Sequence, residues 1–67
     1  MAEITLKAAR VNAGYRLKDA AGTMGISEGT LIRWEKNKTY PNAQQLKMMC
    51  KLYGVKMDDI FLPVELH

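Results

Sequence analysis

Apolar residues recur at intervals of three and four along most of the chain, the spacing that places them on one face of an α-helix. The clearest case is Leu46, Met49, Cys50 and Tyr53, which follow the i, i+3, i+4, i+7 pattern of a buried helical stripe. No stretch alternates between apolar and polar residues convincingly enough to predict a strand. The pattern therefore predicts an all-α fold with five helices, over residues 6–13, 17–24, 28–36, 43–53 and 57–61.

Residues that favour helix ends stand between these stretches. Thr5, Ser27 and Asn42 carry oxygens that can accept a hydrogen bond from a free amide of a first helical turn. Gly25 can adopt the left-handed conformation that ends a helix, and Pro41 stops a helix from running on. The second and third helices are thus predicted to form a pair joined by a tight turn.

The third predicted helix, which is the second member of this pair, has two different faces. Leu31 and Trp34 stand three residues apart and so face the same way, toward the small Ala20 and Ala21 of the second helix. The small alanines let the third helix cross closely. The outward face is the candidate working surface, and it carries Glu28, Gly29, Ile32, Arg33 and Lys36.

Length and composition indicate one small domain over residues 1–67, with residues 1–4 and 63–67 expected to be flexible tails. The net charge of +3 is compatible with a polyanionic partner, and equally with an ordinary surface. A lone Cys50 cannot form a disulfide within the chain, and no signal peptide or long apolar run is present. We therefore expect a cytoplasmic protein without a membrane segment.

Candidate catalytic groups are few and scattered. The only histidine is His67, and Cys50 lies on a predicted apolar face, so neither has an evident partner for nucleophilic catalysis. Asp58 and Asp59 are adjacent, so their side chains would point about 100° apart on a helix. We expect no enzymatic activity, no metal or other cofactor, and no small-molecule ligand.

An ordered set of residues resembles the phage-repressor helix-turn-helix family, the Cro/cI-like or xenobiotic-response-element type. The likeness runs from about Leu6 to Phe61. The matching positions are Ala21, Gly25, Ile26, Ser27, Leu31, Arg33, Trp34, Glu35, Lys38 and Pro41. The resemblance implies a lambda-repressor-like domain that binds double-stranded DNA as a transcriptional regulator. We expect a repressor of the phage type, with the helix over residues 28–36 in the major groove.

Positions that match the family's base-reading residues lie at the start of the third helix. Arg33 could donate two hydrogen bonds to guanine, and Glu28 could accept one from cytosine, although both also suit an exposed helix surface. Ile32 could contact a thymine methyl group or be incidental apolar surface. The implied base contacts are Glu28, Gly29 and Arg33, with Ser27, Thr30 and Ile32 as neighbours.

Polar and basic residues flank this helix and are candidate phosphate contacts, with solubility as the alternative role of each lysine. They are Arg16, Lys18, Lys36, Asn37, Lys38, Tyr40, Asn42 and Gln44. The resemblance also implies an ion pair between Arg10 and Glu35, and we expect a structural role for both and for Trp34.

The chain departs from the family at the start of the second helix. Leu17 stands where a glutamine is usual, and Arg16 replaces the usual threonine or serine cap. A protein-interaction module of the antitoxin or anti-repressor kind on the same scaffold is therefore the alternative function. Homodimerisation is also expected, with Met48, Leu52, Val64 and Leu66 as the candidate contact patch.

Overall fold

Residues 4–61, which the computed structural model describes, form four α-helices and one short 3-10 helix. The elements are α1 (Leu6–Asn12), α2 (Leu17–Met24), α3 (Glu28–Glu35), α4 (Ala43–Tyr53) and the 3-10 helix η1 (Met57–Asp59). The all-α prediction is confirmed, and the prediction of five α-helices is wrong.

The difference lies at residues 57–61, where the predicted fifth helix is replaced by η1 and an extended segment. Ile60 has extended backbone angles and forms a parallel bridge with Ile4. The amide of Ile4 donates to the Asp59 carbonyl and the amide of Phe61 donates to the Ile4 carbonyl, both at 2.8 Å. These pairings use backbone groups that a longer helix would need. Ile4, expected in a flexible tail, is thereby held against the far end of the described chain.

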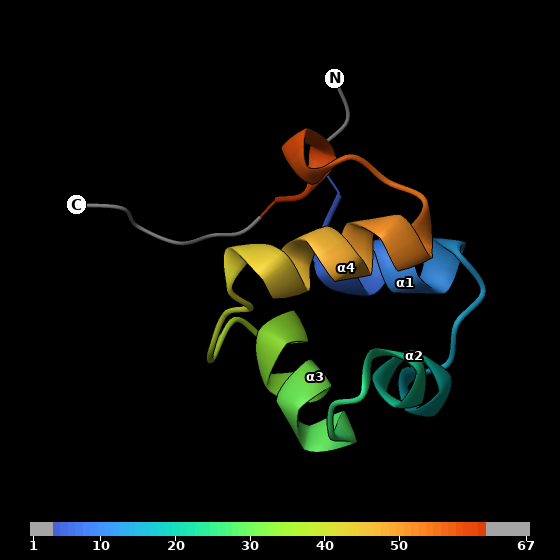
Figure 1. Cartoon of the computed structure of the whole chain (residues 1–67), viewed down its shortest axis with the longest axis vertical. Coiled ribbons are helices and arrows are strands. Elements are labelled where there is room, and N and C mark those ends of the chain that lie inside the picture. The colour runs from blue at the N-terminus through green and yellow to red at the C-terminus, as the bar shows by residue number, and fades with distance from the viewer. Residues whose placement is uncertain (1–3, 62–67) are drawn as a thin grey trace.

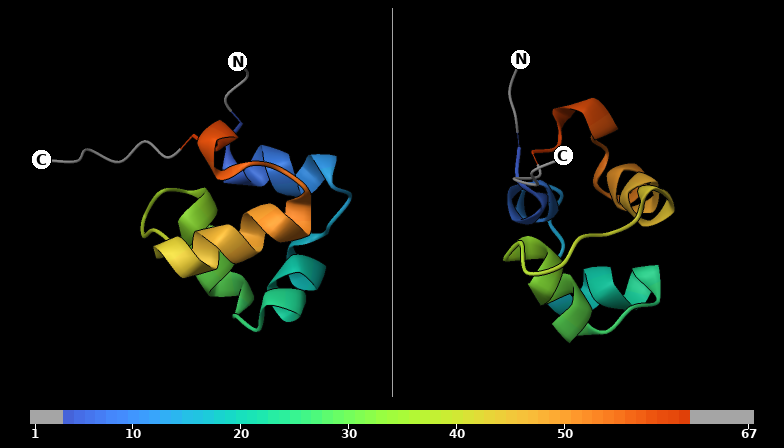
Figure 2. Two further views of the ribbon diagram at one scale, coloured as in Figure 1. Left: turned by 45° about the horizontal axis from the view of Figure 1, so that its top comes forward. Right: turned by 90° about the vertical axis from the view of Figure 1, so that its left-hand side faces the viewer.

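The helices pack in two pairs. Helices α1 and α4 lie side by side, and α2 and α3 pack across them (Figures 1 and 2). The buried core has contributions from all four helices: Leu6, Ala9, Ala20, Ala21, Met24, Leu31, Trp34, Met49 and Tyr53. Leu31 and Met49 are completely inaccessible to solvent. The apolar stripes predicted for α2, α3 and α4 therefore meet at one centre, around Trp34.

Side chains cap three of the helix starts. Thr5 Oγ1 accepts from the Ala8 amide, and Ser27 Oγ accepts from the Thr30 amide, both at 3.1 Å. Asn42 forms a reciprocal capping box with Gln45 at the start of α4. Helix α2 begins at Leu17, and the residue before it, Arg16, forms no side-chain capping hydrogen bond. The capping residues thus define where α1, α3 and α4 begin.

Candidate nucleic-acid interface

A tight turn places α3 against α2. Gly25 ends α2 in the left-handed conformation, with φ of 71°, which glycine adopts without steric cost. The Ile26 amide then donates to the Ala21 carbonyl at 3.0 Å, and Ser27 caps α3. Only two residues, Ile26 and Ser27, separate the Gly25 cap from the first residue of α3. The turn therefore sets the direction in which α3 leaves α2.

The inner side of α3 is fixed by an ion pair as well as by packing. Arg10 Nε lies 2.7 Å from Glu35 Oε2, and Arg10 Nη2 lies 3.2 Å from Glu35 Oε1. The third nitrogen, Nη1, donates to the Tyr15 carbonyl at 2.9 Å. Donating these hydrogen bonds to Glu35 raises the pKa of Arg10, and the side chains of Arg10 and Glu35 are only 10% and 6% exposed. Arg10 thus joins α1, the link before α2 and the end of α3.

Two aromatic residues, Tyr15 and Tyr53, lie next to this pair. The rings of Tyr15 and Tyr53 lie with centroids 6.0 Å apart. Within residues 4–61 the buried Tyr53 hydroxyl has no hydrogen-bond partner. Burial, followed by the charge of Glu35, raises the pKa of Tyr53 to about 12. Tyr53 was predicted to be buried, but helical spacing gives no signal for where its hydroxyl would lie.

The outer side of α3 has a different character. Glu28, Gly29 and Arg33 are exposed, as is the capping residue Ser27. No hydrogen bond or ion pair within the described residues engages the Glu28 carboxylate or the Arg33 guanidinium. Thr30 is half-buried, and its hydroxyl lies 2.9 Å from Ser27 Oγ. The side chains of Glu28 and Arg33 therefore remain available to a partner.

Ile32, expected on the same surface, lies on its flank. It lines a cleft between α1, the start of α2 and the end of α3, together with Lys7, Arg10, Leu17, Glu35 and Lys36. Lys7 had no assigned role in the sequence. Leu17 and Ile32 thus supply apolar walls in a cleft whose other lining residues are charged.

Every candidate phosphate-contacting residue is exposed. They lie at the start of α2, in the loop from α3 to α4, and at the start of α4: Arg16, Lys18, Lys36, Asn37, Lys38, Tyr40, Asn42 and Gln44. The loop folds back on α3, because the Lys38 amide donates to the Arg33 carbonyl at 2.9 Å and Asn37 adopts φ of 61°. The capping box engages the Oδ1 and the backbone amide of Asn42, which leaves the side-chain Nδ2 for other contacts.

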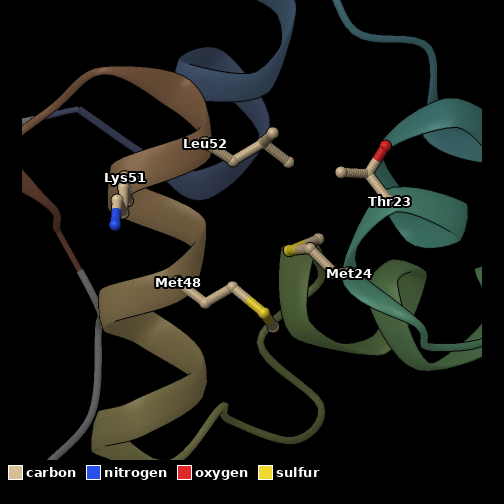
Figure 3. Close-up of a pocket in the computed structure, with 5 residues that line it drawn as sticks. All are labelled: Thr23, Met24, Met48, Lys51 and Leu52. Atoms are coloured by element: carbon tan, nitrogen blue, oxygen red, sulfur yellow. The ribbon is translucent and has the colours of Figure 1, made fainter.

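The two described residues of the candidate dimer patch, Met48 and Leu52, differ in exposure. Met48 and Leu52 project from α4 toward Thr23 and Met24 of α2, across a shallow cleft that Lys51 also lines (Figure 3). Leu52 is half-buried against the core, whereas Met48 is 38% exposed. Val64 and Leu66 lie outside the described residues.

Other kinds of site find little support in residues 4–61. No group of three or more histidine, cysteine or acidic side chains there could hold a metal ion. Cys50 is buried, and burial raises the pKa of its thiol. None of the helices described is long and apolar enough to span a membrane.

Comparison with known families agrees with this geometry. A helix-turn-helix family model matches residues 6–60, so the chain belongs to the helix-turn-helix family. This confirms the resemblance to Cro/cI-like domains. The family is a non-enzymatic class of DNA-binding proteins.

Two relatives illustrate the match. The chain is 34% identical over 62 residues to the HTH-type transcriptional regulator DdrOP3 of Deinococcus deserti, covering 92% of this chain and 48% of the relative. It is 38% identical over 45 residues to the uncharacterized HTH-type transcriptional regulator MJ0272 of Methanocaldococcus jannaschii, covering 67% of this chain and 68% of the relative. The chain therefore spans about half the length of the Deinococcus relative. No solved structure matches the chain significantly.

Proposed function

We propose that this chain is a sequence-specific transcriptional regulator that binds double-stranded DNA, reads the major groove with α3, and represses by occupying its operator. The observation that carries the proposal is the division of α3 into a fixed inner side and an outer side with unengaged polar groups. Both relatives bear names of HTH-type transcriptional regulators. A regulator of this kind acts where the DNA is, so the proposal includes a cytoplasmic location.

The base-reading roles follow from the chemistry of the groove. The major groove admits one α-helix and presents a different donor and acceptor pattern for each base pair. Arg33 has free donors that suit guanine O6 and N7, and Glu28 can accept from the cytosine amino group. Gly29 offers a close approach of the α3 backbone. Ile32, on the flank of α3, would contact at most a base at the edge of the site.

Phosphate contacts would hold α3 in this orientation. The exposed residues at the start of α2 precede the reading helix in the sequence, and those of the loop after α3 and the start of α4 follow it. Helix starts favour phosphate because their free amides and dipole point toward the anion. Contacts of this kind supply most of the affinity and its dependence on salt. Lys38 is an exposed loop cation whose backbone amide bonds the Arg33 carbonyl of α3, and it is the test case.

Specificity also argues for two copies of the chain. One α3 reads only a few base pairs, and helix-turn-helix proteins commonly bind two half-sites about one helical turn apart. We therefore propose a homodimer on DNA. Met48, with its exposed side chain, is the described residue of the candidate patch that is most accessible to a partner.

The decisive experiment selects duplexes from a random pool and then measures affinity as a function of salt. Binding to DNA should weaken steeply, with a slope of about −0.9 for each phosphate neutralised. Arg33→Ala should relax base preference, by about 1–3 kcal/mol at one position. Lys38→Ala should instead weaken all duplexes alike and reduce the salt slope by about one.

Two results would count against the proposal. Equal effects of Arg33→Ala and Lys38→Ala would contradict the separate roles of base reading and phosphate contact. Absence of binding to any duplex at low ionic strength would reject DNA as the partner. It would leave the protein-interaction alternative, whose apolar contacts should respond little to salt.

A further inference from the structure

The guanidinium of Arg33 lies over Gly29, one helical turn nearer the start of α3. A Cβ at position 29 would stand 3.9 Å from Arg33 Nη1 and 3.9 Å from Ser27 Oγ. Helical side chains lean toward the N-terminus and cover the turn before their own Cα. Because Gly29 has no side chain, the space beside the Arg33 guanidinium is open.

We propose that Gly29 determines base specificity by keeping this space open for the Arg33 guanidinium, and so acts as a positioning residue. The inference rests on the proposed function, because it concerns how α3 reads DNA. It assigns to Gly29 a steric role toward Arg33 in addition to a close approach of its backbone to bases.

The surroundings of Gly29 limit what can replace it. A distance of 3.9 Å is an ordinary van der Waals contact, so an alanine methyl group fits beside the guanidinium. A longer side chain would need further room beyond its Cβ. Ser27 cannot readily give way, because its hydroxyl caps α3 through the Thr30 amide at 3.1 Å and meets the Thr30 hydroxyl at 2.9 Å. The longer side chain would therefore displace Arg33.

Arg33 is free to move if displaced. Within residues 4–61 no hydrogen bond or ion pair holds its guanidinium. Its position over Gly29 consequently depends on the shape of the α3 surface alone. A change at residue 29 should alter recognition by Arg33 without disturbing the core beneath α3.

The test compares Gly29→Leu with Gly22→Leu. Gly22 is a matched control, because it is also exposed within a helix, and a Cβ there would meet nothing within 4 Å. On duplexes substituted at single positions, wild-type protein should prefer guanine at the position read by Arg33 by about tenfold. Gly22→Leu should keep this preference. In Gly29→Leu the preference for guanine should fall to that of Arg33→Ala. The double variant Gly29→Leu, Arg33→Ala should show no further loss of this preference.

A second readout does not depend on DNA. Nuclear Overhauser contacts between the Arg33 side chain and the Gly29 α protons should be present in the free wild-type protein. In Gly29→Leu, the Arg33 side chain should lose its contacts with the first turn of α3. Absence of the wild-type contacts would overturn the inference, as would a Gly29→Leu variant that retains guanine preference or whose effect adds to that of Arg33→Ala.

These outcomes separate the inference from the function on which it rests. If Arg33→Ala relaxes base preference and Gly29→Leu does not, only the role of Gly29 is rejected. If wild-type protein binds no duplex, the proposed function is rejected and the inference with it.

Discussion

The junction between α1 and α3 differs sharply from the outer surface of α3, although both use the same helix of eight residues. At the junction, Trp34 is 4% exposed and Glu35 is bound through both carboxylate oxygens to Arg10. On the outer surface, Glu28 and Arg33 are exposed and unengaged within the described chain. Different residues of α3 therefore stabilise the fold and remain available for recognition.

Helical periodicity explains this separation. Residues 31, 34 and 35 fall on one side of a helix with 3.6 residues per turn, and residues 29 and 33 fall on the other. Glu28 lies nearer the first side, but it is exposed at the first residue of α3. The ion pair adds orientation to the packing of Leu31 and Trp34. Because the planar Arg10 guanidinium bonds Glu35 and the Tyr15 carbonyl together, it restricts rotation of α3 about its own axis.

Breaking the junction should have the largest effect. Glu35→Ala leaves the largely buried Arg10 without its carboxylate partner, and should lower the free energy of unfolding by about 3 kcal/mol. Arg33→Ala, on the outer surface, should change it by less than about 0.5 kcal/mol. Urea unfolding of both variants measures the contrast. A loss below about 1 kcal/mol in Glu35→Ala would mean that the pair behaves like one on the protein surface.

The second test raises the pH across the Tyr53 transition. The folded state favours the neutral phenol of Tyr53. It raises the pKa of Tyr53 to about 12, above the value near 10 in an unfolded chain. Between these values the folded state binds more protons, so stability is full below about pH 10 and falls as the pH rises to 12.

Tyr53→Phe isolates this group. It removes a buried hydroxyl without a partner in the described chain, so stability at pH 7 should be unchanged or higher by about 1 kcal/mol. Its unfolding free energy should fall less steeply above pH 10 than that of wild type. An equally steep fall in Tyr53→Phe would assign the alkaline transition to other groups.

Much of the junction was accessible from the sequence, because its determinants are local or belong to a known pattern. Capping by Thr5, Ser27 and Asn42 depends on residues three positions apart, and the structure contains all three caps. The Arg10–Glu35 pair followed from the family resemblance rather than from spacing. The predicted base and phosphate contacts remain predictions, since exposure alone does not identify a partner.

Other features could not be predicted, because they depend on contacts between distant segments. The bridge of Ile4 with Ile60 joins opposite ends of the described chain, and it replaces the expected last turn of helix. Ile32 was placed on the reading surface by periodicity, which does not indicate that α1 and Leu17 border it. The same limit applies to the hydroxyl of Tyr53, whose surroundings come from the packing of α4 near Arg10 and Glu35.

A smaller effect is expected at the point where the two regions meet. Ser27→Ala removes the cap of α3 and should cost about 1 kcal/mol of stability, because the Thr30 amide loses its acceptor. Ser27→Gly, which retains the favourable backbone conformation, should cost only a few tenths of a kcal/mol of stability. Thermal unfolding of both variants at constant pH gives the comparison. Losses near zero in both variants would show that the hydroxyl contributes little to the start of α3.

The smallest effect concerns Gly22, on the exposed side of α2. A methyl group there would meet nothing within 4 Å, so Gly22→Ala should stabilise the protein by up to about 1 kcal/mol through helix propensity alone. The same change at Gly25 should destabilise it by about 1–2 kcal/mol, because Gly25 has φ of 71°, which is costly for a residue with a side chain. Urea unfolding of the two variants should therefore give shifts of opposite sign. If Gly22→Ala were destabilising, the exposed side of α2 would have to make contacts beyond the described fold, and surface positions could no longer be treated as independent of stability.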